Sequence, residues 1–203
     1  MQKLMFDDKR NLTEMVIDYE KEMTRRIEKF CKSIPDAVKR GFTRFEILPN
    51  RIVRLWNDNR NTFIEYKTRF AIGEIVAVAQ SYRDMYTPPL IDENGNSYII
   101  GNATAGWNNK MFVKSWNCTH QIRIIDIKIE RLQDINDEDC LKEGIFIIDS
   151  HEHLHYGYHN TKIGDIGFLK PRDAFSHLIN AISGKGTWDE NPYVVAYSFK
   201  LIK

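Results

Sequence analysis

The sequence predicts an α+β fold, in which a mixed β-sheet or barrel is flanked by short helices. Many short runs of residues are typical of strands, whereas only about three stretches have helical spacing, and this disfavours a doubly wound sheet. The chain has 203 residues and is 42% hydrophobic, so it is long enough to bury a core as one elaborated domain. We therefore expect a single domain over residues 1–203.

The first helix is expected to begin near Asn11 or Thr13, either of which can cap it, and to end near Lys21. Its helical spacing is carried by the apolar residues Met15, Val16 and Tyr19. After it, Glu22–Ile27 alternates in character and predicts a short strand or an extended segment. A corner between helix and strand is therefore expected near Lys21.

Two β-rich runs enclose a turn rich in Asn and Asp and predict a hairpin. The runs are Arg51–Trp56 and Thr62–Tyr66, and the turn is Asn57–Asn61. Residues 35–41 are expected to form a loop or a short helix before them. Ile75–Ala79 is apolar on both faces and predicts a strand that is covered on both sides, as in a barrel surrounded by helices.

Residues 84–110 are irregular and are expected to form an inserted loop. They contain the turn signals Pro88-Pro89 and Asn94-Gly95, and a small hairpin is expected over residues 91–100. Long ordered loops in compact domains often carry function. A second insertion is expected over residues 146–170.

The clearest strand prediction covers Gln121–Leu132. Its isoleucines follow a period of two that slips by one residue at Ile124-Ile125. A β-bulge at this dipeptide would turn both halves of the pattern toward the core. The halves are Ile122 with Ile124, and Ile125 with Ile127 and Ile129.

The last third of the chain predicts two helices and a final strand. Asn136 can cap a short helix, Asp137–Lys142, whose acidic first turn suits the helix dipole and which Gly144 ends. A second helix is expected over Pro171–Gly184. Tyr193–Leu201 predicts the last strand. The apolar face of the second helix is Ala174, Phe175, Leu178 and Ile182.

Composition excludes several function classes. The chain carries 29 basic and 28 acidic residues, which disfavours non-specific binding of nucleic acid over a whole basic surface but allows a local basic cleft. The first eight residues contain no apolar core of a secretory signal, and no run approaches the ~20 apolar residues of a membrane span. We expect a cytoplasmic protein with reduced cysteines and no membrane partner. Nucleophile-elbow, P-loop and zinc-finger spacings are absent from the sequence.

Three separated stretches resemble the ASCH family, a branch of the PUA-like superfamily. They are Asn11–Thr13 with Glu20–Arg26, Ile129–Ile135 with Glu138–Gly144, and Trp188–Val194. The first is similar to the family's opening helix and its Gly-Arg-Lys-Thr-x-Thr-x-Arg motif. The second is similar to a strand and a short acidic helix that ends in Glu-Gly. The third is similar to the Trp-Asp-x-Asn-Pro-aromatic-Val segment of members often found in phages and prophages.

The resemblance implies a PUA-like (ASCH) mixed β-barrel flanked by short helices. In such a barrel, the corner after the first helix would meet the short acidic helix at the mouth. The sequence departs from the first motif at Tyr19-Glu20, where Gly-Arg is usual, and at Glu22, where Thr is usual. Both departures lie beside the implied site and bear more on activity than on fold.

The resemblance also implies a chemistry, because the family includes bacterial amidohydrolases that remove the acetyl group from acetylcytidine. Their catalytic Lys, Thr and Glu correspond to Lys21, Thr24 and Glu143. A Thr hydroxyl becomes nucleophilic when a neighbour takes its proton. Lys21 can take it only when neutral, with a pKa lowered from ~10.4 by burial or by a cation such as Arg25 or Arg26. Glu143 would pass a proton to the leaving amine, and no cofactor is implied.

Each of these residues also has an ordinary structural interpretation. Lys21 could belong to a solvated helix end, Thr24 to a plain strand and Glu143 to an exposed helix C-terminus. Arg25 and Arg26 could grip a phosphate or pair with a carboxylate. The Arg that the family repeats at this place favours a ligand role for Arg26.

Two residues of the irregular segment are further ligand candidates. Trp107 could stack on a base, and Lys110 could contact a phosphate. Packing and solubility are the more usual roles of such residues.

A histidine cluster lies in the second expected insertion. For it we expect a polar hairpin or loop and no metal, because helical His-Glu-x-x-His spacing and a nearby cysteine are missing. The cluster consists of His151, His153, His155 and His159.

The sequence therefore predicts a nucleobase- or RNA-binding protein whose activity stays open. In one version, the protein is an amidohydrolase of a modified, acetylated cytosine nucleoside. In another, the same cleft recognises RNA or a modified base without chemistry. A third alternative is a phage accessory protein that binds a host protein and uses its barrel as a scaffold, which the mixed charge permits.

Overall fold

The computed structural model describes residues 1–85, 90–91, 94, 97–98, 105–150 and 153–202. Its strands are β1 (Gln2–Leu4), β2 (Met23–Arg26), β3 (Arg44–Leu48), β4 (Ile52–Asn57), β5 (Thr62–Lys67), β6 (Ile75–Val78), β7 (Leu90–Ile91), β8 (Ser97–Tyr98), β9 (Gln121–Arg131), β10 (Phe146–Ser150), β11 (His153–Tyr158), β12 (Ile166–Phe168) and β13 (Tyr193–Leu201). Its α-helices are α1 (Leu12–Ile17), α2 (Ile34–Lys39), α3 (Tyr82–Met85), α4 (Asp137–Lys142), α5 (Pro171–Ser183) and α6 (Thr187–Glu190).

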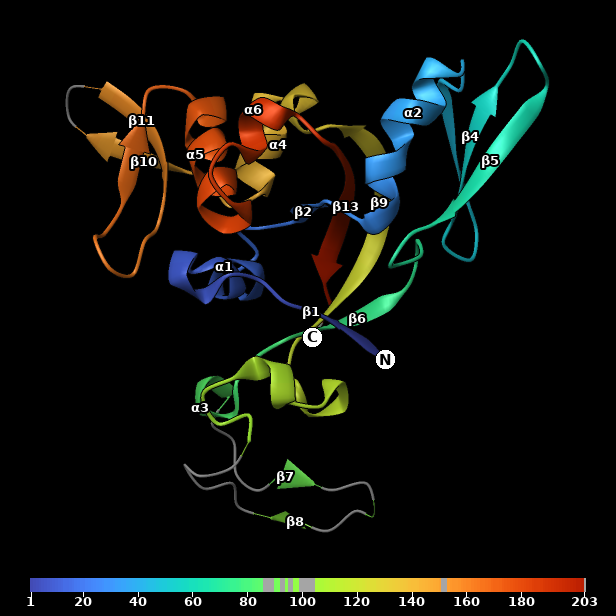
Figure 1. The fold of residues 1–203 in the computed structure, drawn as a ribbon. Helices are drawn as coiled ribbons and strands as arrows, with labels where there is room; N and C mark the ends of the chain where they lie inside the picture. Colours follow the sequence, from blue (N-terminus) through green and yellow to red (C-terminus); the bar gives the residue numbers. More distant parts are fainter. Residues whose placement is uncertain (86–89, 92–93, 95–96, 99–104, 151–152, 203) are drawn as a thin grey trace.

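A five-stranded sheet in the order β1-β6-β9-β13-β2 forms the centre of the molecule (Figure 1). The long strands β9 and β13 pair antiparallel, β2 pairs with the other edge of β13, and β1 lies parallel to β6. Within the described part of the chain, this sheet has two open ends and no closed barrel. The α+β class is therefore confirmed, while the PUA-like barrel stays a prediction.

The predicted β-bulge lies in β9. Ser198 pairs with Asp126 and Phe199 pairs with Ile124, so that Ile125 is the extra residue. The expectation that Ile125 faces the core is wrong, because the side chain of the inserted residue is turned outward and is 43% exposed. The isoleucines that the bulge does bring to the core are Ile122, Ile124, Ile127 and Ile129.

Two smaller sheets flank the central one. The expected hairpin is present as β4 and β5, and β3 pairs with the other edge of β4, a strand that the sequence did not predict. On the opposite side, the expected insertion over residues 146–170 contains the sheet β10-β11-β12, against which α5 packs (Figure 1). The helix buries most of its expected apolar face, but Ile182 is 40% exposed.

The first helix is shorter than expected. It ends at Ile17, four residues before Lys21, because Tyr19 adopts the left-handed backbone conformation with φ 63°. The amides of Glu20 and Lys21 then both donate to the carbonyl of Met15, at 2.8 and 3.0 Å. The corner between helix and strand is thus a tight hydrogen-bonded turn that places Lys21 just before β2.

Several expectations concern segments that the structure describes only in part. The small hairpin expected over residues 91–100 appears as the pairing of β7 with β8, while residues 92–93, 95–96 and 99–100 lie outside the described residues, as do His151 and Glu152. All three cysteines are buried and free. No helix in the described ranges has the length and apolar character needed to cross a bilayer.

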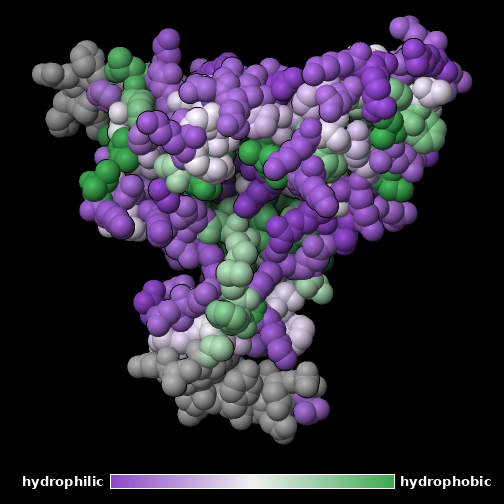
Figure 2. Space-filling view, in the orientation of Figure 1, coloured by the Kyte–Doolittle hydropathy of each residue, from purple (hydrophilic) through white to green (hydrophobic). Residues whose placement is uncertain are grey.

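The visible face of the molecule is mainly hydrophilic, and hydrophobic side chains gather on it over the β10–β12 side (Figure 2). The exposed hydrophobic residues of this side are Ile147, Ile163 and Leu169.

Candidate functional site

Backbone hydrogen bonds join three elements that lie far apart in the sequence. The amide of Glu22 donates to the carbonyl of Lys142 at the end of α4, at 3.0 Å. The carbonyl of Glu22 accepts from the amide of Phe199 in β13, at 2.8 Å. Glu22, the last residue before β2, is therefore hydrogen-bonded both to α4 and to the central sheet. This connection sets Lys21 opposite Glu143.

The position of Glu143 follows from the local sequence of α4. The side chain of Asn136 accepts from the amide of Asp139 at 2.7 Å and so caps the helix as predicted. Gly144 has φ 99°, the left-handed conformation in which glycine commonly follows a helix. The helix therefore ends at Lys142, and Glu143 is held inside the protein, only 5% exposed. The alternative expectation, that Glu143 is an exposed residue at the C-terminus of a helix, is therefore wrong.

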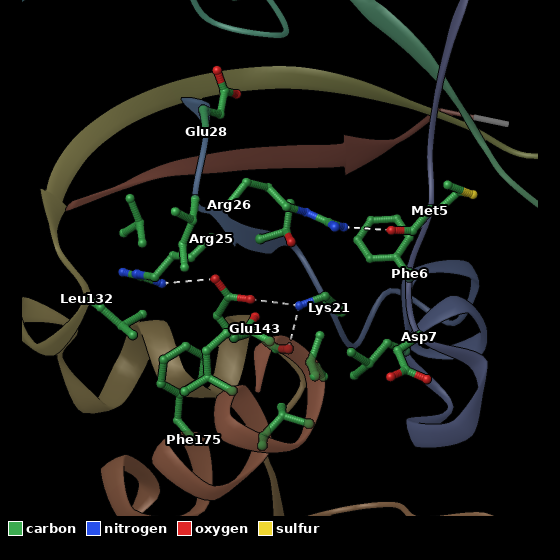
Figure 3. Close-up of a pocket in the computed structure, with 18 of the residues that line it drawn as sticks. Met5, Phe6, Asp7, Lys21, Arg25, Arg26, Glu28, Leu132, Glu143 and Phe175 are labelled. Atoms are coloured by element: carbon green, nitrogen blue, oxygen red, sulfur yellow. Dashed lines mark hydrogen bonds and ion pairs between the residues drawn. The ribbon is translucent and has the colours of Figure 1, made fainter. Parts of the chain in front are cut away.

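A cavity of about 730 Å³ opens between β2, α4, α5 and the segment before α1 (Figure 3). One wall is apolar and the other is charged. The apolar wall includes Leu12, Leu132, Phe175, Leu178 and Ile179. The polar wall includes Lys21, Thr24, Arg25, Arg26, Glu28, Arg69 and Glu143.

Lys21 and Glu143 form a buried ion pair at the base of this cavity. The Nζ of Lys21 donates to Oε2 of Glu143 at 2.9 Å and also to the backbone carbonyl of Glu143. Burial lowers the pKa of Lys21, against the attraction of Glu143, and the charges of Arg26 and Arg25 lower it further. Burial alone would raise the pKa of Glu143, but the charges of Lys21 and Arg25 outweigh it and hold that pKa below its usual range.

Arg25 organises the acidic side of the pair. Its side chain is fully buried, and its guanidinium lies 2.6 Å from Glu130 Oε1, 2.9 Å from Asp139 Oδ2 and 3.1 Å from Glu143 Oε1. Three carboxylates thus share one guanidinium, which donates charge-assisted hydrogen bonds to each of them, while Oε2 of Glu130 is buried with no hydrogen-bond partner among the described residues. Of the two roles expected for Arg25, the geometry favours pairing with carboxylates, and Figure 3 shows Glu143 held between Arg25 and Lys21.

Arg26 and Thr24 are held much less completely. Arg26 donates from Nη2 to the carbonyl of Met5 at 2.6 Å, and its guanidinium lies 5.7 Å from the ring centroid of Phe6. Its Nε is buried, and no described residue is its hydrogen-bond partner. Thr24 is 5% exposed and lines the cavity, and its hydroxyl makes no hydrogen bond to another residue in the described ranges. Both side chains line the cavity, and the part of the guanidinium of Arg26 other than Nη2 and the hydroxyl of Thr24 make no hydrogen bond within the described ranges.

Trp107 and Lys110 do not line the cavity. Trp107 is partly buried against a small separate hydrophobic cluster. The Nζ of Lys110 donates to the carbonyl of Phe6 and to Asp8 Oδ1, at 2.6 Å each, and so ties the irregular segment to the start of α1. These contacts give both residues structural roles away from the cavity.

Sequence reasoning missed a second polar cluster on the cavity wall. Tyr197 donates its hydroxyl to Glu28 Oε1, and the backbone amide of Arg69 donates to the same carboxylate at 3.1 and 3.2 Å. Burial raises the pKa of Glu28. Glu28 lies two residues after β2, and nothing in the local pattern indicates that Tyr197 and Arg69 meet it.

No family model, curated protein or solved structure matches the chain. The resemblance to the ASCH family therefore rests on the three motif stretches alone. Among the described residues, no group of three or more His, Cys, Asp or Glu side chains is arranged to hold a metal ion.

Proposed function

We propose that this protein is an amidohydrolase that removes an acyl group from the exocyclic amine of a cytosine nucleoside. One observation carries the proposal. Lys21, Thr24 and Glu143, the residues that match the catalytic positions of the resembled amidohydrolases, line a single cavity, although Glu143 lies 122 positions from Lys21. The cavity also offers an apolar wall against which a base can pack.

The proposed reaction begins with proton transfer from Lys21 to Glu143 within their ion pair. Neutral Lys21 then takes the proton of Thr24 as Oγ attacks the amide carbonyl carbon. As the carbonyl re-forms, the C–N bond breaks, and protonated Glu143 gives its proton to the departing amine. Lys21 is then an ammonium again, Glu143 is a carboxylate, and Thr24 carries the acyl group as an ester.

Water completes the cycle. Glu143 takes a proton from water as the water oxygen attacks the ester, and the ammonium of Lys21 returns a proton to Thr24 Oγ when the C–O bond breaks. A proton passes back from Glu143 to Lys21, and the carboxylic acid is released. The lowered pKa of Lys21 assists the neutral form that the first attack requires, whereas the lowered pKa of Glu143 opposes the transfer of the proton to its carboxylate.

Acetate release from acetylcytidine tests the proposal. Thr24→Ala removes the nucleophile and should lower the rate roughly 10³-fold or more, while Thr24→Ser should retain part of it. Thr187→Ala is the matched control, because Thr187 is 7% exposed, donates its hydroxyl to the carbonyl of Gly184 and is not among the residues that line the cavity. Turnover that survives in Thr24→Ala, or no turnover by the wild type at micromolar enzyme, would rule the mechanism out.

The second candidate function is a module that binds its ligand without catalysing a reaction. It is favoured by the hydrogen bonds that both carboxylate oxygens of Glu143 already accept. Its two carboxylate oxygens are engaged by Lys21 and by Arg25, an arrangement that also suits a rigid recognition site. This version predicts binding of cytidine or RNA with no acetate release. The host-protein alternative stays a prediction of the sequence.

A further inference from the structure

The cavity lining is unbalanced in charge. Its acidic residues are Asp7, Glu28 and Glu143. Its basic residues are Lys21, Arg25, Arg26, Lys29 and Arg69. The lining thus has five basic and three acidic residues. The ion pairs that each carboxylate makes show which of the basic residues lack a partner.

All three carboxylates are already engaged. Asp7 forms an ion pair at 2.8 Å with Arg10, a residue that does not line the cavity. Glu143 is shared by Lys21 and Arg25. Glu28 accepts from the hydroxyl of Tyr197 and from a backbone amide. The carboxylates of the lining therefore make no ion pair with its other cations.

The unpaired cations are Arg26, Lys29 and Arg69, for which the described residues supply no carboxylate within ion-pair distance. Arg69 donates from Nη2 to the carbonyl of Lys3 at 3.2 Å, which engages only one edge of its guanidinium. Burial lowers the pKa of Arg26, the charge of Glu143 acts against this, and the charge of Arg69 lowers the pKa further. Lys29 is exposed at the same wall. Three cations are therefore gathered at one wall, where Glu143 and Glu28 act against their mutual repulsion but make no ion pair with them.

An anion would relieve that repulsion and would satisfy the open donors. Guanidinium groups match phosphate oxygens with paired charge-assisted hydrogen bonds, and the gain is largest where one guanidinium is partly buried. We infer that Arg26, Arg69 and Lys29 form an anion subsite that binds a phosphate group, so that the ligand of this cavity is phosphorylated. This inference depends on the proposed function only in taking the nucleobase of the ligand to be cytosine.

Geometry places the subsite beside the proposed reaction centre. In Figure 3, Arg26 lies between the Lys21–Glu143 pair and Glu28, while Phe175 lies on the opposite side of Glu143. A base near Glu143 would thus leave its sugar phosphate near Arg26. The volume of about 730 Å³ falls in the range of small-molecule sites, roughly 300–1,000 Å³.

The phosphate could belong to a mononucleotide or to a polynucleotide. A shallow groove of about 700 Å³ shares Glu28, Lys29 and Arg69 with the cavity and adds the basic residues Arg51 and Lys67. It offers a path for a longer strand. The chemistry of the subsite is the same for both sources, and separate ligands distinguish them.

Calorimetric titration with cytidine, cytidine 5′-monophosphate and a five-nucleotide cytidine oligoribonucleotide tests the inference. The monophosphate should bind roughly 10- to 100-fold more tightly than cytidine. Arg69→Gln and Arg26→Gln should each bring that ratio toward one. Arg60→Gln is the matched control, because Arg60 is exposed in the β4–β5 turn and lines neither the cavity nor the groove.

The outcomes separate the subsite from the proposed function. Equal affinities for cytidine and its monophosphate, or a ratio that Arg69→Gln leaves unchanged, would overturn the subsite. Arg69→Gln carries this test if Arg26→Gln fails to fold. Tighter binding of the oligonucleotide that Lys67→Gln weakens identifies the polynucleotide as the source, and equal binding of both phosphorylated ligands identifies the mononucleotide. If the monophosphate binds as expected while acetylcytidine and its monophosphate are not hydrolysed, the amidohydrolase proposal fails and the subsite stands.

Discussion

Replacing Arg25 by methionine is expected to be strongly destabilising. The side chain of Arg25 is fully buried and lies within 3.1 Å of three carboxylates. After the replacement, Glu143 keeps Lys21 and Glu130 keeps the partly exposed Lys128. Asp139 loses its only ion-pair partner among the described residues.

Removing one partner of a buried ion pair costs about 3–5 kcal/mol. A domain of this size loses roughly 2–4 °C of Tm per kcal/mol, so the Arg25→Met melting temperature should fall by about 6–20 °C. Urea unfolding followed by far-UV circular dichroism gives the free energy directly. Arg44→Met is the control, because the pair of Arg44 with Asp58 is exposed to solvent, with 53% and 55% of the two side chains accessible, and its loss should change the stability little.

The comparison of the two variants tests whether Arg25 stabilises the buried carboxylates of Glu130, Asp139 and Glu143. If Arg25→Met and Arg44→Met lose the same small free energy, the three carboxylates are stabilised by other means, and the electrostatic account of the site is wrong. A large loss that appears for Arg25→Met alone supports it.

Three further changes test the site and the fold by urea unfolding. The pKa of Glu143 is lowered in the fold, so its carboxylate stabilises the protein above the unfolded value of about 4.5, and this contribution is lost as the pH falls through the lower folded pKa. Glu143→Gln should therefore show a weaker dependence of stability on acid pH than the wild type, and an identical dependence would contradict the shift. Gly144→Ala should lose more free energy than Gly73→Ala: both positions have positive φ, but a Cβ at 144 would meet side chains of α1 at 3.0 and 3.3 Å, whereas at 73 nothing lies within 4 Å. Equal losses of free energy in the two variants would show that the side chains of α1 move aside without cost. Ile124→Ala should cost about 2–5 kcal/mol and Ile125→Ala about 0.5 kcal/mol or less, and the reverse order would refute the position of the bulge.

Patterns within a few residues predicted most of the local structure. The cap at Asn136, the glycine stop at Gly144 and the slip at Ile124-Ile125 each depend on neighbouring residues, and the structure confirms all three. The end of α1 was misplaced because the left-handed turn at Tyr19 has no glycine to signal it. The outward turn of Ile125 was missed because periodicity alone does not say which residue of a bulge is the extra one.

The site was predicted only in part, through the motif resemblance. Lys21, Thr24 and Glu143 do line one cavity, but the burial of Lys21 and the role of Arg25 as the partner of three carboxylates depend on contacts across the fold. The cluster of Glu28 with Tyr197 spans 169 positions. Pairings at such separations leave no periodic trace in the sequence.

By itself, the sequence determined the α+β class, the principal helices and strands and the residue types available for chemistry, because propensity, capping and hydrophobic period act over a few neighbouring residues. Tertiary structure alone decided which charges meet. The backbone bonds of Glu22 bring the end of α4 to the start of β2, so that burial and neighbouring charge can set the pKa values of Lys21 and Glu143. Electrostatic interaction depends on distance in space and on exclusion of water, and both exist only once the chain has folded.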